Sequence, residues 1–377
     1  MGEWREVKLG DVLELKYGKD HKALSDGNIP VYGSGGIMRY ADTFLYDKES
    51  ILIPRKGTLN NIFYLNGEQP FWTVDTIFWS KINTELTFGK FLFYYLKIID
   101  FANLNVGSAV PSLTTKVLNE VDISLPPLKE QKTIAQVLSS LDDKIDLLHR
   151  QNKTLEEMAQ TLFRQWFIEE AKDEWEEILL GDYVTTTTGY SYKSTELNPS
   201  KNALITLKNF ARDGSFRLDG FKEFTGTKFK DKQIVHNGDL VVSHTDITQE
   251  ADIIGNPIIV SNIHNYDTLI ITMDLMKVES NAEWLTKEYL YYLFKSSDFK
   301  FHCLCNSNGT TVLHMSRKTI PSYKVKIPSK DKILEFSNKA KNLLKKQNQN
   351  QQQIKTLENM RDTLLPKLMS RDVRVEL

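Results

Sequence analysis

Basic, amide and hydroxyl side chains gather in short segments of both halves of the chain, a composition suited to contacting nucleic acid. In the first half these candidates are Lys19, His21, Lys22, Ser34, Gly35, Arg39, Arg55, Lys56, Thr58 and Asn60, and in the second half they are Tyr190, Tyr192, Lys193, Lys228, Lys230, His244, Thr245, Thr248 and Gln249. Lysine and arginine contact phosphates and guanine edges, whereas asparagine and glutamine pair with adenine. Each cluster alone is typical of a solvated surface, but their recurrence beside predicted strand ends favours nucleic-acid binding.

No residue spacing typical of catalysis accompanies these segments. The chain lacks G-x-x-x-x-G-K-[ST], H-E-x-x-H and G-x-S-x-G, the motifs of phosphate-binding loops, zinc proteases and serine hydrolases. The glycine-rich stretch Tyr32–Tyr40 lacks the G-x-G-x-x-G spacing of a dinucleotide site, and it predicts a tight loop that approaches a ligand closely. We therefore expect no catalytic residues, while an enzyme with an unrecognised kind of site stays open as an alternative.

The segment His302-Cys303-Leu304-Cys305 suggests a zinc site. Such a site needs about four ligands. The chain has only two cysteines, Cys303 and Cys305, so no second pair completes it. We expect no metal site and no disulfide framework, which is typical of a cytoplasmic protein.

The overall composition excludes several classes of protein. The 377 residues include 48 basic and 49 acidic side chains, so the chain is no polybasic polyanion binder, and its 41% hydrophobic content is enough for buried cores. No apolar run of about 18 residues predicts a membrane span. The N-terminal stretch Met1–Asp11 lacks the apolar segment of a secretion signal. The length suits two domains with connections.

An internal duplication is the strongest signal in the sequence. Trp4, Glu6, Leu9, Gly10, Asp11 and Gly18 recur 171 residues later as Trp175, Glu177, Leu180, Gly181, Asp182 and Gly189. Lys90–Lys97 resembles Glu288–Lys295 at an offset of 198, and Lys153–Leu162 matches Lys355–Leu364 at an offset of 202. The rising offset means that the second copy carries 31 extra residues, most of them before its tyrosine-rich segment.

Each copy has the same predicted plan. Short strands with turn signals come first, then a helical aromatic block, and then a strand that ends in proline and leads into a long helix. The predicted fold class is α+β, with two mixed α/β domains separated by a long antiparallel two-helix coiled coil and related by a pseudo-two-fold internal repeat. The predicted segments are 1–127 (first domain), 128–174 (central helix), 175–329 (second domain) and 330–377 (C-terminal helix).

Both long helices carry a heptad-like apolar seam. In the central helix the seam comprises Ile134, Leu138, Leu141, Ile145, Leu148, Leu155 and Leu162, interrupted by Asn152, and its counterparts 202 residues later include Leu343, Ile354, Leu357 and Leu364. The second seam is polar within Gln347–Gln353. A low-complexity linker is one interpretation of that run. Because the seam resumes in register at Ile354, we predict one continuous helix, with a kink or an end near Pro366.

Net charge favours pairing of the two helices with each other. Residues 128–174 carry seven basic and ten acidic side chains, a net of −3, whereas residues 330–377 carry eleven basic and six acidic, a net of +5. Opposite net charges favour hetero-pairing over self-pairing. Two separate helices, each with an outside partner, are the alternative.

These features resemble the specificity subunits of type I restriction–modification systems, over essentially the whole chain. The resemblance is carried by W-x-x-x-x-L-G-[DE] at Trp4 and Trp175, YGSGGI at Tyr32, PRKGT at Pro54 and, most specifically, L-P-P-L-K-E-Q at Leu125–Gln131. The second copy departs from the family pattern, with PSKDKI at Pro328–Ile333 in place of PPLKEQ.

The resemblance implies a non-catalytic subunit that confers DNA sequence specificity in DNA methylation and phage defence. Two target-recognition domains each read one half of a split, asymmetric site in double-stranded DNA, and the helices set the spacer and dock two methyltransferase subunits. S-adenosylmethionine then belongs to the methyltransferase partner, and ATP and Mg belong to a restriction partner. The resemblance leaves open whether two restriction subunits also bind. The alternatives are a specificity subunit of a different modification or phage-defence assembly and a coiled-coil adaptor that binds only proteins.

Overall fold

The computed structural model describes residues 3–107, 110–248 and 250–376. Its internal contacts divide the chain into two units: the first comprises residues 1–146 and 355–377, and the second comprises residues 147–354. The segments predicted from the sequence are consecutive stretches of the chain, whereas the two units are defined by internal contacts. The unit boundaries fall inside both long helices, so each long helix contributes a part to each unit. None of the helices in the described part of the chain combines the length and apolar character that a bilayer crossing requires.

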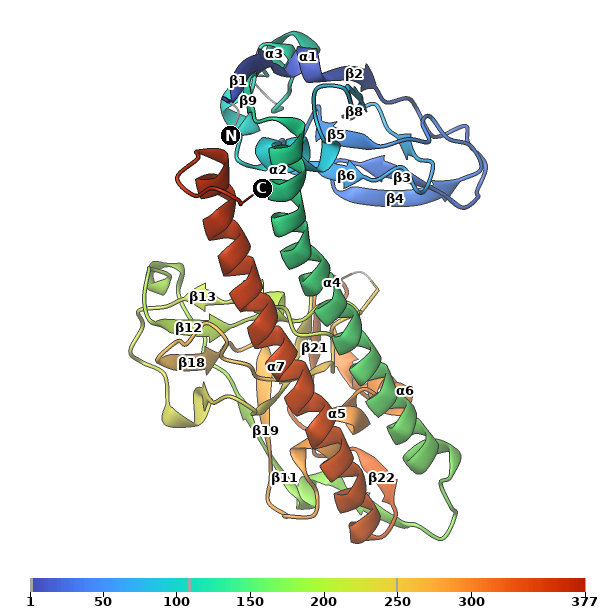
Figure 1. Cartoon of the computed structure of the whole chain (residues 1–377). Coiled ribbons are helices and arrows are strands. Elements are labelled where there is room, and N and C mark those ends of the chain that lie inside the picture. The colour runs from blue at the N-terminus through green and yellow to red at the C-terminus, as the bar shows by residue number, and fades with distance from the viewer. Residues whose placement is uncertain (1–2, 108–109, 249, 377) are drawn as a thin grey trace. The chain divides into compact units, whose positions relative to one another are not determined.

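The first unit contains a four-stranded sheet in the order β2-β8-β5-β6, a three-stranded sheet in the order β4-β3-β7 and the strand pair β1-β9 (Figure 1). Its elements before the long helices are β1 (Arg5–Lys8), α1 (Leu9–Val12), β2 (Leu13–Tyr17), β3 (Ile29–Gly33), β4 (Gly36–Ala41), β5 (Ser50–Pro54), β6 (Phe63–Leu65), β7 (Trp72–Thr73), β8 (Ile77–Ile82), α2 (Gly89–Lys97), α3 (Thr115–Asn119) and β9 (Asp122–Leu125). Strand β5 is buried along its whole length, and Phe91, Leu92 and Tyr94 of α2 share a core with its residues Ile51 and Ile53.

The second unit contains two four-stranded sheets, ordered β11-β19-β15-β17 and β13-β12-β18-β14, with a three-stranded sheet β16-β21-β20 and the pair β10-β22. Its elements are β10 (Glu176–Leu179), β11 (Val184–Thr188), β12 (Asn202–Ile205), β13 (Lys222–Glu223), β14 (Ile234–Val235), β15 (Leu240–Ser243), β16 (Thr245–Asp246), β17 (Pro257–Ile259), β18 (Thr268–Ile271), β19 (Leu275–Ser280), α5 (Lys287–Phe294), α6 (Ser297–Cys305), β20 (Ser307–Asn308), β21 (Leu313–Met315) and β22 (Lys324–Ile327). Helices and strands are both abundant in each unit, so the α+β class is confirmed.

Corresponding strands of the two units pair in the same register. The matching pairs are Leu13–Ile82 and Val184–Ser280, Ile53–Phe78 and Val242–Met276, and Arg5–Leu125 and Glu176–Ile327. Equivalent positions differ by 171 residues at the start of each unit and by 202 residues at its end, which are the offsets of the sequence repeat. These registers support the duplication that the sequence predicts.

The two long helices contact each other in an antiparallel sense within each unit. Helix α4 (Leu128–Arg164) continues into a π-helical turn at Gln165–Glu169, and α7 spans Lys330–Met369 without a break, so the glutamine-rich run is helical as predicted (Figure 1). In the first unit, Asp142 accepts a hydrogen bond from Arg361 Nη1 at 2.8 Å. In the second unit, Asn350 Nδ2 donates to Asn152 Oδ1 at 2.9 Å. The polar interruption at Asn152 is therefore matched by a polar partner.

The predicted seam follows the buried face of the helices only in part. Ile134, Leu138, Ile145, Leu148 and Ile354 are buried, whereas Leu141, Leu155, Leu162, Leu343, Leu357 and Leu364 are half-buried. Near the end of α4, Ala159 and Phe163 are buried, and Phe163 comes one residue after the predicted Leu162, which is half-buried. An α-helix repeats every 3.6 residues, so a seam followed in steps of 3.5 drifts away from the interface.

Gln131 fastens the start of α4 to the start of α2. Its side chain is 1% exposed; its carbonyl oxygen accepts from Phe88 N at 2.7 Å and Thr87 Oγ1 at 3.1 Å, and its amide donates to Pro126 O at 2.9 Å and Leu86 O at 3.2 Å. At the equivalent place in the second unit, Ile333 is fully buried, and Thr286 Oγ1 instead shares a hydrogen bond with Ser337 Oγ at 2.6 Å. The second copy thus has a buried apolar side chain where the first copy has a buried, hydrogen-bonded glutamine.

We expect Gln131→Leu to lower the free energy of unfolding of the first unit by about 3 kcal/mol, because it leaves several buried polar groups without partners, each costing about 1–3 kcal/mol. Denaturant unfolding followed by tryptophan fluorescence measures this change. Ile333→Leu is the matched control and should cost less than about 1.5 kcal/mol. Equal losses for the two variants would contradict the prediction.

Candidate nucleic-acid interface

Three turns of the first unit meet around one hollow on its surface, with a volume of about 620 Å³. The lining residues are Asp20, His21, Lys22, Gly33, Ser34, Gly35, Met38, Val74, Asp75 and Thr76. Gly18 allows the first turn to approach the third, because a Cβ atom there would lie 2.1 Å from the carbonyl oxygen of Val74. The predicted candidates His21, Lys22, Ser34 and Gly35 are thus brought together.

The loop after β5 reaches the same hollow through Arg55 and Asn61. Arg55 Nη1 donates to Asp75 O at 3.0 Å, and its guanidinium carbon lies 5.4 Å from the centre of the Tyr17 ring. Asn61 Nδ2 donates to Ser34 O at 2.7 Å and so ties this loop to the tip between β3 and β4. A guanidinium has five N–H donors, so Arg55 is held in place and retains donors for a phosphate or a guanine edge.

The remaining candidates of the first unit fall into two groups. Lys19, Lys56 and Thr58 are exposed on the loops just described. Arg39 donates to Asp26 Oδ1 at 2.6 Å and to Leu24 O at 3.2 Å, and Asn60 Nδ2 donates to Asp100 Oδ1 at 2.9 Å. These two side chains are engaged within the unit, and their contact with nucleic acid stays a prediction that requires an exchange of partners.

In the second unit, Tyr190 and Tyr192 belong to a small aromatic cluster. Tyr190 OH donates to Glu196 Oε1 at 3.0 Å, and the ring packs edge-on against Phe224. Tyr192 OH accepts from Lys222 Nζ at 2.8 Å. The predicted lysines Lys193, Lys228 and Lys230 are exposed. Both tyrosines are half-buried, so their rings stabilise the loop and expose only part of their surface.

The other candidates of the second unit lie between β15 and the loop that follows β16. Thr245 is 3% exposed, and its Oγ1 lies 3.2 Å from Nδ1 of His314. Thr248 Oγ1 donates to Asp246 Oδ1 at 2.7 Å. His244 is half-buried, and burial together with the nearby His314 and Arg317 lowers the pKa of its imidazole below the ordinary value. Gln249 lies outside the described residues.

Arg55 and His244 occupy equivalent positions in their units. Arg55 N donates to Thr76 O at 2.8 Å and Arg55 O accepts from Leu113 N at 2.9 Å, while His244 makes the same two bonds to Asp274 O at 2.7 Å and from Met315 N at 2.9 Å. In the same way, Lys56 is bridged to Ser112, and Thr245 pairs with His314. The candidate loops of the two units thus leave their sheets at the same strand ends.

This equivalence adds His314 and Arg317, which the sequence reasoning missed. Both side chains are exposed, and both lie close enough to His244 to depress its pKa. A signal for His314 was present, because it lies 202 residues after Ser112, in the loop that returns to the candidate segment of each copy. Two imidazoles and a guanidinium therefore gather in the second unit where the first unit has Arg55 and Lys56.

The two cysteines differ in their surroundings, and Cys303 belongs to the core of the second unit. Cys303 is fully buried, and burial raises the pKa of its thiol to about 12, with Lys300 offsetting part of the effect. Cys305 is exposed, and His302 Nε2 lies 2.9 Å from Thr319 O. Within the described ranges, no three His, Cys, Asp or Glu side chains are grouped closely enough to hold a metal ion.

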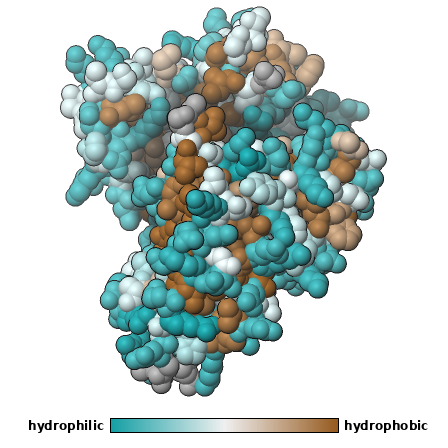
Figure 2. Space-filling model, turned by 90° about the horizontal axis from the view of Figure 1, so that it is seen from above, coloured by the Kyte–Doolittle hydropathy of each residue, from teal (hydrophilic) through white to brown (hydrophobic). Residues whose placement is uncertain are grey.

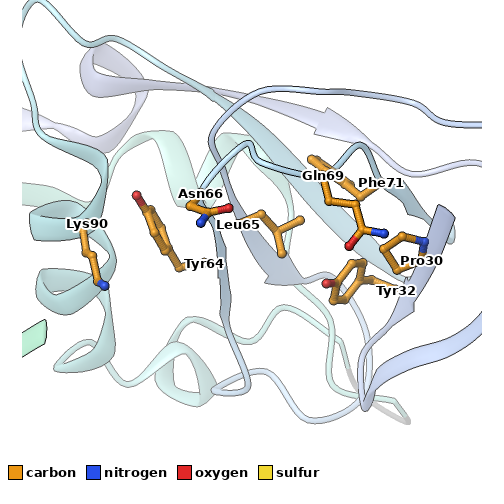
Figure 3. A pocket seen from close by; sticks show the side chains of 8 residues that line it. All are labelled: Pro30, Tyr32, Tyr64, Leu65, Asn66, Gln69, Phe71 and Lys90. Carbon is orange, nitrogen blue, oxygen red and sulfur yellow. The ribbon is translucent and has the colours of Figure 1, made fainter. Parts of the chain in front are cut away.

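A second hollow of the first unit is lined by residues of β3, β6, the segment between β6 and β7, and α2, with a volume of about 280 Å³ (Figure 3). Its lining residues are Pro30, Tyr32, Tyr64, Leu65, Asn66, Gln69, Phe71 and Lys90. Tyr64 OH donates to Glu49 Oε1 at 2.5 Å, and Lys90 Nζ lies 5.9 Å from the centre of the Tyr64 ring. None of the predicted nucleic-acid contacts lines this hollow, so it is separate from the candidate interface.

Comparison with known proteins finds similarity to specificity proteins of type I restriction–modification systems. Residues 1–157 match the family described as "Type I restriction modification DNA specificity domain". The type I restriction enzyme MjaIX specificity subunit of Methanocaldococcus jannaschii is 26% identical over 320 residues, covering 76% of this chain and 70% of that protein. The MjaVIII specificity subunit of the same organism is 23% identical over 358 residues, covering 86% of this chain and 82% of that protein.

The fold is also similar to that of a solved protein. The crystal structure of the S subunit of a type I restriction-modification system from M. genitalium aligns with a TM-score of 0.62, covering 99% of this chain and 96% of that one at 16% identity. The likeness extends over both units, whereas the family match ends within α4.

Proposed function

This chain belongs to the specificity-subunit family of type I restriction–modification systems, and from that premise we propose that it selects the DNA sequence on which such a complex acts. The observation that carries the proposal is the equivalence of the two candidate interfaces. Arg55 and His244 stand at the same strand end of the two units, each among exposed basic side chains. Lysine and arginine at such positions contact phosphates and guanine edges of double-stranded DNA.

Each unit reads one half of a split target in this proposal. The two interfaces share a backbone frame and differ in side chains, with Arg55, Lys56 and Thr58 in the first unit standing where His244, Thr245 and Ile247 stand in the second. Base readout depends on side-chain donors and acceptors. The two half-sites should therefore differ in sequence, which makes the whole target asymmetric.

The long helices set the spacer between the half-sites and dock two methyltransferase subunits. Support comes from the antiparallel contacts Asp142–Arg361 and Asn152–Asn350, which suit an antiparallel coiled coil. Helix α4 has 37 residues. At about 1.5 Å per residue it is about 55 Å long, which limits the spacing of the half-sites to about 16 base pairs.

The chain itself performs no catalysis in this proposal. S-adenosylmethionine is bound by the methyltransferase partner, and ATP and Mg by a restriction partner where one is present. Methyl transfer, DNA cleavage or ATP hydrolysis by the purified chain would contradict it.

The test is to co-express the chain with the methyltransferase subunits of its own system and to sequence the methylated bases. We expect one asymmetric sequence with an unread spacer. Arg55→Ala and Arg55→Lys should each reduce methylation at least about tenfold, because lysine cannot reproduce a bidentate contact. Lys48→Ala, which removes an exposed lysine outside the hollow, is the control and should leave methylation unchanged.

The salt dependence of DNA affinity separates this proposal from a protein-binding adaptor. Phosphate contacts make the logarithm of the affinity fall linearly with the logarithm of the salt concentration. An affinity that does not change with salt, or methylation that stays unchanged in both Arg55 variants, would overturn the proposal.

A further inference from the structure

One strongly apolar side chain is displayed within the candidate interface of the second unit. Exposed hydrophobic residues lie among hydrophilic ones on the molecular surface (Figure 2). Ile247 is 64% exposed, more than any other isoleucine, leucine or valine among the large exposed side chains of the described chain. It follows β16 directly, three residues after His244. A single exposed isoleucine is ordinary on a protein surface, so the significance of Ile247 depends on its place in the candidate interface and on how its loop is held.

The loop that carries Ile247 is held by a buried carboxylate. Asp246 is fully buried and accepts hydrogen bonds from Thr248 N at 2.7 Å, Thr248 Oγ1 at 2.7 Å, Ile253 N at 2.6 Å and Ile254 N at 2.7 Å. Burial alone would raise the pKa of this carboxyl, but these hydrogen bonds hold it below its ordinary value. The carboxylate therefore stays charged and bonded, and it fixes the backbone on both sides of the loop.

A lysine from α6 secures the far end of the same loop. Lys300 Nζ donates to Ile254 O at 2.6 Å, to Asp252 O at 3.0 Å and to Asn256 Oδ1 at 3.1 Å. The loop also contains Ala251 in the left-handed region with φ of 55°, a conformation that persists only where the surroundings enforce it. The protein thus uses a buried carboxylate and a half-buried ammonium group to hold a short loop whose first residue is an exposed isoleucine.

The second interface has apolar side chains at two positions that correspond to polar side chains of the first unit. Ile247 lies 189 residues after Thr58, the same offset that relates His244 to Arg55. Met273 is 48% exposed and lies 198 residues after Asp75, which lines the hollow of the first unit. The second interface is apolar at two positions where the first is polar. An apolar side chain in the major groove contacts the C5-methyl group of thymine, which no other base carries.

We propose that Ile247 reads the methyl group of a thymine in the half-site of the second unit, with Asp246 and Lys300 as the positioning residues of its loop. The proposal rests on the proposed function. It assigns a base class to one named side chain, so it can fail while sequence-specific DNA binding by the chain stands.

The experiment uses the full chain with its methyltransferase partner and duplexes that carry the methylated sequence. Each thymine of the second half-site is replaced in turn by deoxyuridine, which removes only the methyl group. Burial of one methyl-sized group is worth about fourfold in affinity. We expect wild-type protein to lose about fourfold at one position, measured by fluorescence anisotropy, and Ile247→Ala to bind the thymine and deoxyuridine duplexes equally.

The control is Phe301→Ala, which truncates a 68% exposed aromatic side chain of α6 in the same unit. It should retain the wild-type sensitivity to deoxyuridine. Three results would overturn the proposal: a half-site without thymine, no deoxyuridine effect in the wild type, or the same effect in Ile247→Ala. Loss of methyltransferase binding in Ile247→Ala with the deoxyuridine effect intact would also overturn it and would assign the side chain to a protein partner. An absence of sequence-specific binding by the wild type would instead defeat the proposed function.

The positioning role predicts a graded response. Asp246→Ala should abolish discrimination between thymine and deoxyuridine, whereas Asp246→Asn, which keeps one acceptor oxygen, should restore part of it. The fold-change in affinity caused by base substitutions in the first half-site should stay at the wild-type value in both variants, which reports that the chain is folded. A uniform loss of affinity for both half-sites, without a change in methyl discrimination, would overturn the assignment of Asp246.

Discussion

Deleting one heptad from each long helix, Ile145–Gln151 from α4 and Gln352–Glu358 from α7, is expected to shorten the unread spacer of the methylated sequence by about three base pairs. Seven residues correspond to about 10 Å of helix, and a base pair to about 3.4 Å. The seam repeats every seven residues, so the remaining interface stays in phase. The bases read in each half-site should not change.

The choice of residues follows from the contacts between the helices. Asp142–Arg361 and Asn152–Asn350 flank the deleted segments on both sides. Both pairs survive the deletion, as does the hydrogen bond of 2.6 Å from Tyr94 OH to Asp142. Residues 202 apart in the sequence are equivalent in the two copies, but an antiparallel pair places other residues opposite each other, and a compensating deletion at Leu343–Gln349 would remove Gln347, which donates to Asn152 O at 3.0 Å.

A five-residue deletion from each helix is the control for this experiment. Five residues turn the helix by about 140° beyond full turns, so the downstream apolar face is directed away from its partner. Methylation should then be lost altogether. If the double heptad deletion kept the original spacer, contacts other than those of the helices would set the distance, and the proposal that the long helices set the spacer would be wrong.

The regular elements followed from sequence pattern because their physics is local. The seam that resumes at Ile354 predicted a continuous helix through the glutamine-rich run, and α7 confirms it. The drift from Leu162 to Phe163 could not be predicted from heptads, because it depends on the difference between 3.5 and 3.6 residues per turn.

The interface was less predictable, because the partners of its polar side chains are distant in sequence. Threonine is a residue type that is usually exposed, yet Thr245 is buried against His314, 69 positions away in the sequence. Arg39 is engaged by Asp26, which no spacing rule links to it. Residue type predicts which segments contact nucleic acid, but the burial and pairing of each side chain depend on strand registers that only the structure supplies.

Matching registers lead to the prediction with the largest effect on specificity. We expect that replacing residues 184–280 by a second copy of residues 13–82 gives a subunit whose methylated target consists of two inverted copies of the first half-site. The segments begin and end at equivalent strand pairs, Leu13–Ile82 and Val184–Ser280. The next hydrogen bond also matches, from Asn83 N to Val12 O at 2.9 Å and from Asn281 N to Tyr183 O at 2.7 Å.

The exchanged segments contain the candidate residues predicted from the sequence, whereas His314 and Arg317 lie outside them. The hydrogen bonds of Gln131 and Tyr292 that involve the long helices are left in place. Gln131 keeps its bonds to Thr87 and Phe88, and Tyr292 OH keeps its bond of 3.3 Å to Glu156. The reciprocal chimera, with residues 184–280 in place of 13–82, should give a symmetric target built from the second half-site. Sequencing of methylated bases decides between the outcomes. If the first chimera still methylated the original asymmetric target, bases would be read outside these segments, and the assignment of one half-site to each unit would have to be abandoned.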